Sequence, residues 1–95
     1  MPVLLDLNNP EFQTQWFSLE KEGRLAVLNC CARLKLMEWD AVYKDRGLHW
    51  ELIHSRIGIG NERLYSIRIT QKIRAVVKRT GNFMEFLTLH PDTPI

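Results

Sequence analysis

Cysteines, long apolar runs and metal-binding clusters are scarce or absent in this chain of 95 residues, and each absence excludes a class of protein. The two cysteines, Cys30 and Cys31, are neighbours, so on a helix they point about 100° apart and are poorly placed for a disulfide. No group of histidines and cysteines has the spacing of a zinc site. No apolar run is long enough to span a membrane, and the N-terminal segment lacks the pattern of a signal peptide. We therefore expect a reduced, cytoplasmic protein with no structural metal, no cofactor and no membrane partner.

Length and composition are those of one soluble domain spanning residues 1–95, with a hydrophobic fraction of 45% and a net charge of +2. Positive charge is concentrated between Leu64 and Met84, where there are five basic residues and no acid. The remaining 74 residues hold eight basic and eleven acidic ones. The five basic residues are Arg68, Lys72, Arg74, Lys78 and Arg79. This local surplus suits an anionic partner such as a phosphate backbone, although a solvated sheet face is the simpler interpretation of a charge run alone.

The first third of the chain predicts a strand followed by a helix. Pro2–Leu7 is a short apolar run that suits an N-terminal strand. Asn9 as N-cap and Pro10 at the first helical position mark a helix start. We expect Lys21–Gly23 to break this helix. One face of it carries Phe12, Trp16 and Leu19 at helical spacing.

A second helix is predicted from about Arg24 to Met37, packed antiparallel to the first as a helical hairpin. Its broad apolar face is formed by Leu25, Leu28 and Ala32, with Val27, Cys31 and Leu34 beside them. Between residues 38 and 60, Leu48–Ile53 is expected to be extended or partly strand-like, and Gly58 and Gly60 predict a loop. Trp39 and Trp50 are expected to cover the edge of the core.

The last segment alternates with period two and predicts three antiparallel strands in a meander. Thr80–Asn82 predicts the turn before the third strand, Phe83–Leu89. Tyr65, Ile67 and Ile69, then Ile73, Ala75 and Val77, are expected to pack on the helices. Arg74, Val76 and Lys78 take the opposite face of their strand, and the open face of the sheet is expected to present Arg68, Arg74 and Lys78. The order of elements indicates an α+β fold: an N-terminal strand, a two-helix antiparallel hairpin and a three-stranded meander.

The order of elements, together with the run LYSIRITQKIRAVV and a later strand ending LTLHPD, resembles the RelE/ParE toxin superfamily of bacterial type II toxin–antitoxin systems. Within that superfamily the chain is most similar to the RelE-like and YoeB-like ribonuclease toxins, which share the arginine-rich R-x-T pattern found here at Arg68–Thr70. The detailed resemblance covers roughly the last third of the chain. The predicted helical hairpin agrees with the family only in the order and arrangement of its elements. The resemblance implies the RelE-like microbial RNase fold and a cognate antitoxin protein as partner.

The resemblance also implies an activity, namely cleavage of messenger RNA in the ribosomal A site, without metal, by attack of a ribose 2′-hydroxyl on the adjacent phosphate. Such a reaction needs a proton acceptor, a proton donor and cations against the developing phosphate charge. Arg74 matches the family's phosphate-clamping arginine, and Arg68 matches a second basic position. His90 stands where the family has a basic residue or histidine, and histidine titrates near neutral pH.

Other residues receive lesser roles in this interpretation. Glu51 is a possible general base by alignment to YoeB-like members, although an ordinary surface acid is the simpler interpretation. RNA-backbone binding is assigned to Lys72, Lys78 and Arg79. Many relatives carry an aromatic residue shortly after the last strand, whereas this chain has none after Phe86. Two alternatives therefore stay open: a ParE-like toxin that inhibits gyrase, and an inactive relative that binds only antitoxin or RNA.

Overall fold

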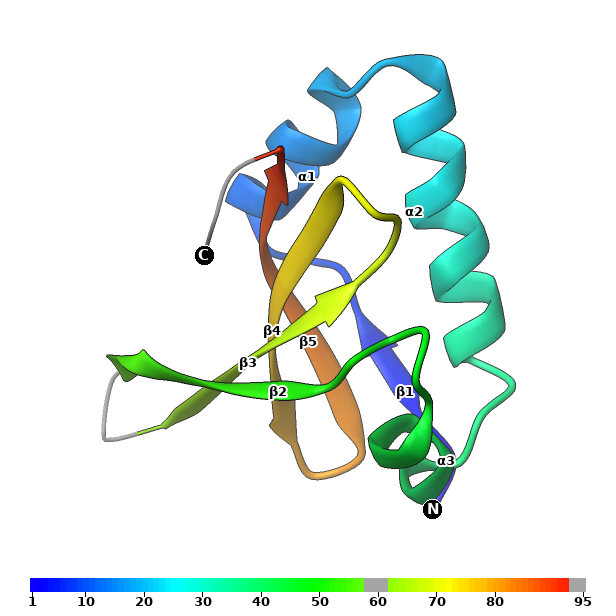
Figure 1. Cartoon of the computed structure of the whole chain (residues 1–95), viewed down its shortest axis with the longest axis vertical. Coiled ribbons are helices and arrows are strands. Elements are labelled where there is room, and N and C mark those ends of the chain that lie inside the picture. Colours follow the sequence, from blue (N-terminus) through cyan, green and yellow to red (C-terminus); the bar gives the residue numbers. More distant parts are fainter. Residues whose placement is uncertain (58–61, 93–95) are drawn as a thin grey trace.

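The computed structural model describes residues 1–57 and 62–92, which form an α+β fold around one five-stranded sheet (Figure 1). The predicted loop at Gly58 and Gly60 lies outside the described residues. The elements in chain order are β1 Leu4–Asp6, α1 Pro10–Ser18, α2 Lys21–Leu34, α3 Trp39–Lys44, β2 Glu51–Ile57, β3 Arg63–Arg68, β4 Ile73–Thr80 and β5 Phe83–Pro91.

The sheet has the strand order β1-β5-β4-β3-β2, so the chain's first strand pairs with its last. β1 runs parallel to β5, whereas β2, β3, β4 and β5 form an antiparallel meander. Three strands were predicted in this meander and the structure has four, because the stretch that forms β2 was predicted as extended or partly strand-like and was not counted among them. Its sequence, ELIHSRI, mixes charged and apolar residues, so the strand is defined by pairing with β3 rather than by its own pattern. The strand direction turns strongly from β5 to β2 (Figure 1).

α1 begins at the predicted N-cap, but it ends before the predicted helix break. The Asn9 side chain accepts hydrogen bonds from the backbone N–H groups of Glu11 and Phe12, as an N-cap does. The helix break lies at residues 19–20, so the predicted break at Lys21–Gly23 is wrong, since α2 begins there. Gly23 serves close packing instead, because a Cβ at this position would lie 3.3 Å from Cβ of Leu19 and 3.4 Å from Cδ1 of Ile73.

The buried face of α2 includes only part of the predicted broad apolar face. Leu25 and Leu28 are 46% and 49% exposed, and Ala32 is exposed as well, so the first predicted stripe faces solvent. Two apolar stripes lie side by side on this helix, and the sheet covers only one of them. The covered stripe consists of Val27, Cys30, Cys31 and Leu34. Both cysteines are free thiols in this buried face. α1 packs mainly along β5, and its contact with α2 includes the bond from Trp16 Nε1 to the Arg24 carbonyl at 3.2 Å.

A short third helix, α3, was not predicted, because six residues with one Val and one Ala show little helical periodicity. Tertiary contacts hold it in place. Trp39 is 1% exposed, and its indole N–H donates to the carbonyl of Asn82 in the β4–β5 turn at 3.0 Å. That turn is tight, with Gly81 at a φ of 61°, as the sequence predicted. Trp39 and Trp50 meet edge to face at 5.6 Å between centroids, so both aromatics line the core.

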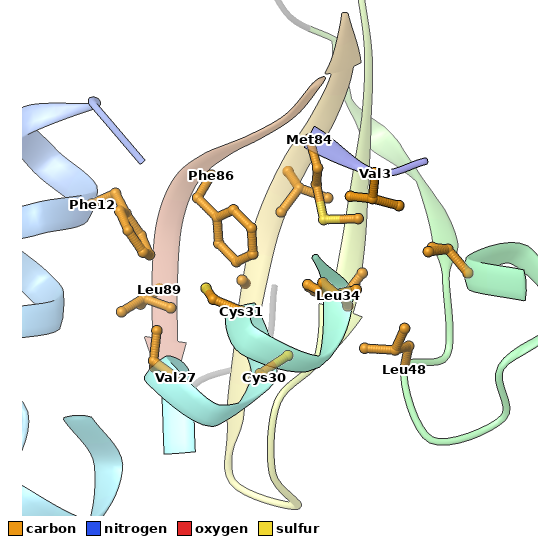
Figure 2. Close-up of a cluster of buried hydrophobic side chains, with 14 of the residues drawn as sticks. Val3, Phe12, Val27, Cys30, Cys31, Leu34, Leu48, Met84, Phe86 and Leu89 are labelled. Atoms are coloured by element: carbon orange, nitrogen blue, oxygen red, sulfur yellow. The ribbon is translucent and has the colours of Figure 1, made fainter. Parts of the chain in front are cut away.

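The core lies between the sheet and the helices, where side chains from both ends of the chain converge. Figure 2 shows Phe12 from α1 against Phe86 from β5, with ring centroids 5.2 Å apart. Leu34 from α2 and Met84 from β5 are fully buried in the same cluster. The buried cluster consists of Val3, Phe12, Val27, Cys30, Cys31, Leu34, Trp39, Val42, Leu48, Ile67, Ile73, Ala75, Val77, Met84, Phe86 and Leu89. The packed helices therefore occupy one face of the sheet, which leaves the opposite face for the polar residues.

Candidate nucleic-acid interface

Three of the predicted site residues form one row across the sheet. Arg68 on β3 is the register partner of Arg74 on β4, and Arg74 is the partner of His90 on β5. Directly opposite residues in antiparallel strands have side chains on the same face and about 5 Å apart at Cβ. Three residues that are far apart in the sequence are thus brought side by side on the face away from the core. We call Arg68, Arg74 and His90 the cationic row.

His90 reaches this face because β5 has an irregular register. Val76 pairs with Thr88 and Val77 pairs with Phe86, so one residue of β5, Leu87, has no partner on β4. Phe86 and Leu89 are both in the core, at an odd spacing that regular alternation forbids. The extra residue moves Thr88 and His90 to the face of Arg74, where the two side chains meet with 2.8 Å between Thr88 Oγ1 and His90 Nε2.

A second row lies beside the cationic row. Glu51, Ser66, Val76 and Thr88 are successive register partners from β2 to β5. Val76 lies on the predicted face with Arg74 and Lys78, but it is buried there, at 2% exposed. Its position on a central strand, flanked by strands on both sides, removes it from solvent even on the polar face. Ser66 is likewise buried at 5%.

The two arginines of the row have no ion-pair partner among the residues that the structure describes. Arg68 is exposed and Arg74 half-buried. Like charges directly opposite each other on neighbouring strands destabilise a sheet. An anion held between the guanidinium groups would relieve that repulsion, and a phosphate offers the oxygens for bidentate hydrogen bonds.

The other three basic residues between Leu64 and Met84 occupy different environments. Lys72 is exposed in the β3–β4 turn. Lys78 shares the face of the row, but its ammonium group lies 2.8 Å from Glu62 and 3.6 Å from Glu85. The hydrogen bond to Glu62 and, further, the charge of Glu85 raise the pKa of Lys78 above its ordinary value. Arg79 pairs with Met84 on the core side, where its guanidinium stacks on Trp39 at 4.3 Å and bonds to the Tyr43 hydroxyl.

Glu51 lies at the β2 end of this surface and contacts His49. Its Oε2 is 2.7 Å from Nε2 of His49. The carbonyl of Leu48, immediately before His49, accepts a hydrogen bond from the backbone N–H of Arg68 at 2.7 Å. The sequence carries no reliable signal for this contact, because residues two apart share a face only in an extended strand, and His49 lies in the turn before β2.

Arg68 also borders a pocket of about 350 Å³ between the end of β3 and α2. Its lining includes Asn29 and Arg33 on α2, and Arg33 is 3.7 Å from Asp45. Within residues 1–57 and 62–92, no three His, Cys, Asp or Glu side chains converge in a way that suits a metal ion. In the same part of the chain, no helix is both long and apolar enough to cross a membrane.

No family model matches the sequence, and no curated protein matches it either. A solved structure that is similar over the full length is the crystal structure of the archaeal RelE–RelB complex from Pyrococcus horikoshii OT3. The similarity covers 100% of both chains with a TM-score of 0.69 and a sequence identity of 16%. At this identity the comparison establishes the fold, and it confirms the fold expected from the resemblance. The chain therefore has a RelE-like fold.

Proposed function

We propose that this protein is the toxin component of a type II toxin–antitoxin system and a ribosome-dependent endoribonuclease that cuts messenger RNA. The observation that carries the proposal is the cationic row, because it brings two arginines and a histidine together on the open face of a RelE-like fold. The fold alone is compatible with many activities, so the residues on this surface, rather than the fold, support the nuclease. That surface offers two of the requirements of cleavage by an internal 2′-hydroxyl, namely positive charge for the phosphate and a proton donor.

Each member of the row has a distinct role in the proposed reaction. Arg74, between Arg68 and His90, binds the scissile phosphate and stabilises the charge that develops on its oxygens. Arg68 binds the same phosphate or the next one, since its guanidinium is exposed beside that of Arg74. His90 protonates the leaving 5′ oxygen, with Thr88 fixing the orientation of its ring. This family-type reaction needs no metal, and these residues supply its charge and its protons.

Lys72 extends the proposed surface along the RNA backbone, whereas Lys78 contributes less because two carboxylates already surround its ammonium group. Arg79 was also expected to bind RNA, but its contacts with Trp39 and Tyr43 on the core side favour a structural role. The proposed macromolecular substrate is messenger RNA in the ribosomal A site.

The proposed protein partner is a cognate antitoxin that folds on the toxin surface. Exposed apolar side chains give such a partner a place to bind. Leu25 and Leu28 on α2 are about half exposed, Phe17 at the end of α1 is 63% exposed, and Leu36 after α2 is 88% exposed. Bound antitoxin would cover apolar area that is unfavourable in water.

The proposal is tested by adding purified protein to a bacterial translating extract that contains a defined messenger RNA. Cut sites are mapped by primer extension, and the ends of the products are analysed chemically. We expect cuts within codons at the A site, ends that carry 2′,3′-cyclic phosphate, and no cleavage of the same RNA without ribosomes. Intact messenger RNA, at protein amounts that arrest growth in cells, would refute the nuclease. Inhibition of gyrase under those conditions would then identify the gyrase-inhibiting alternative.

A matched pair of variants separates the site from general effects of charge. Arg74→Ala should reduce cleavage by about 10²–10³-fold, the usual loss when a group that stabilises transition-state charge is removed. Arg63→Ala should cleave like the wild type, because Arg63 is exposed on β3, five residues before Arg68 and thus on the other face of the strand. Equal activity of both variants would show that the site lies elsewhere. Circular dichroism checks that each variant is folded.

A further inference from the structure

The backbone of His49 is unusual, and its side chain contact is specific. His49 has a φ of 51°, in the left-handed region that residues with a Cβ rarely adopt. Its Nε2 is 2.7 Å from Oε2 of Glu51, a distance typical of a charge-assisted hydrogen bond. A strained conformation that holds one side chain against another is a reason to examine the pair for function.

The position of this pair relative to the cationic row is fixed by the sheet. Glu51 is the register partner of Ser66, two residues before Arg68 on β3. The bond from the Arg68 N–H to the Leu48 carbonyl fixes the start of β2 against the end of β3. His49 therefore lies near the Arg68 end of the row, and His90 forms the opposite end. Arg68 and Arg74, the proposed phosphate ligands, lie between them.

We propose that His49 is the general base of the cleavage reaction and that Glu51 is its positioning residue; this inference rests on the proposed nuclease function. With the Nε2–H of His49 donated to Glu51, the lone pair of Nδ1 is left to accept a proton. The 2′-hydroxyl gives its proton to Nδ1 as its oxygen forms a bond to phosphorus. The bond from phosphorus to the 5′ oxygen breaks, and His90 protonates that oxygen. The products are a 2′,3′-cyclic phosphate and a 5′-hydroxyl.

The arrangement favours His49 over Glu51 as the base. In-line displacement needs the acid and the base on opposite sides of the phosphorus atom, and the two histidines flank the two arginines in that order. The charged group that contacts the His49 side chain is Glu51, and the His49 backbone N–H donates a hydrogen bond to the Asp45 carbonyl at 3.1 Å. Glu51 is directed at the imidazole, so it orients the ring as the carboxylate does in other dyads of this kind.

Three single variants test the assignment in the extract assay. His49→Asn should reduce cleavage by about 10²-fold or more, the usual loss of a general base, and should fold because Asn tolerates the left-handed conformation. Free imidazole in the millimolar range should restore part of that activity. Glu51→Gln should lose less activity than His49→Asn, because the amide still holds the ring. His54→Asn changes an exposed histidine on β2, is the control and should cleave normally.

The outcomes separate this inference from the proposed function. If the wild type cleaves while His49→Asn retains full activity, the nuclease stands and His49 is not its base. If Glu51→Gln is the more damaging change and imidazole restores nothing to His49→Asn, Glu51 itself is the base and the inference is wrong. If the wild type does not cleave, both the function and the inference fail. If His49→Asn loses cleavage activity, His54→Asn keeps it, and imidazole restores part of the activity of His49→Asn, the assignment is supported. A residue with a merely structural role would not respond to imidazole.

Discussion

Phe86 and His90 lie four residues apart on β5, yet Phe86 faces the core and His90 is the register partner of Arg74 on the opposite face. The unpaired Leu87 between them causes the reversal, because one extra residue in a strand flips the side chains that follow it. Without this irregularity the alternation from Phe86 would direct His90 into the core. The cationic row therefore depends on a single extra residue.

This arrangement predicts opposite phenotypes for two neighbouring residues. His90→Gln should reduce cleavage by about 10²-fold, because a proton donor is lost, with little loss of stability. Leu89→Ala should instead lower the free energy of unfolding by about 2–5 kcal/mol, because Leu89 is 2% exposed in the core. Urea denaturation and the extract assay measure the two effects. Similar stability losses in both variants would contradict the placement of Leu89 in the core and of His90 on the opposite face.

Arg74→Lys tests whether the shape of the guanidinium is needed or only its charge. A lysine keeps the positive charge opposite His90 but has a compact ammonium group that cannot hold two phosphate oxygens as a fork does. We expect a cleavage rate reduced about tenfold or more. RNA affinity should change little because the charge is retained. Single-turnover rates and binding measurements distinguish these effects, and an unchanged rate would mean that charge alone suffices.

Lys72 and Lys78 should differ in how they affect the salt dependence of RNA binding. Lys72 has no carboxylate partner among the described residues, whereas Lys78 lies between Glu62 and Glu85. Lys72→Ala should lower the slope of log K against log salt by about 0.7–0.9, the value for one lost phosphate contact. Lys78→Ala should change the slope less. Titrations at several salt concentrations measure it, and the reverse order would place the RNA nearer Lys78.

Two phenylalanines of α1 should differ strongly in their contribution to stability. Phe12 is fully buried against Phe86, so Phe12→Ala should lower the free energy of unfolding by about 3–5 kcal/mol. Phe17 is 63% exposed, and Phe17→Ala should cost less than about 1 kcal/mol. Both changes have the same effect on helix propensity, so the difference reports burial. Denaturation curves measure it, and comparable losses would contradict the orientation of α1.

Alkaline pH should destabilise the protein through its buried thiols. Burial raises the pKa of Cys31 from 9.0 to about 12 and raises that of Cys30 in the same direction. Below pH 9 the thiols are protonated in both states, so the full stability is present. Above pH 9 the thiol loses its proton first in the unfolded protein. The free energy of unfolding then falls by up to about 1.4 kcal/mol per pH unit per thiol, until the pH reaches the pKa of the thiol in the folded protein.

Urea denaturation at about pH 8 and about pH 10 measures this fall. Cys31→Ala removes one titrating thiol and should lose less stability between the two pH values than the wild type does. Its lower starting stability, from the lost volume in the core, does not affect that comparison. An equal fall in the two proteins would show that Cys31 is accessible to water in the folded state.

The sequence by itself determined the features that depend on near neighbours. Asn9 and Pro10 fixed the start of α1, and Gly81 fixed the turn between β4 and β5. Period-two alternation identified β3, β4 and β5, and the resemblance to the RelE/ParE superfamily anticipated the fold that the structural comparison then established. These signals were sufficient because caps, turns and alternation act within a few residues.

Only the tertiary structure decided which stripe of α2 is buried and that β2 joins the sheet. It also decided which of the basic residues share a face. Arg79 turns to Trp39 on the core side, His90 turns to Arg74 because Leu87 is unpaired, and His49 meets Glu51 beside Arg68. Each outcome depends on register and packing between segments that are distant in the sequence. Local patterns specify alternation within a strand, but the strand's partners determine what each face meets.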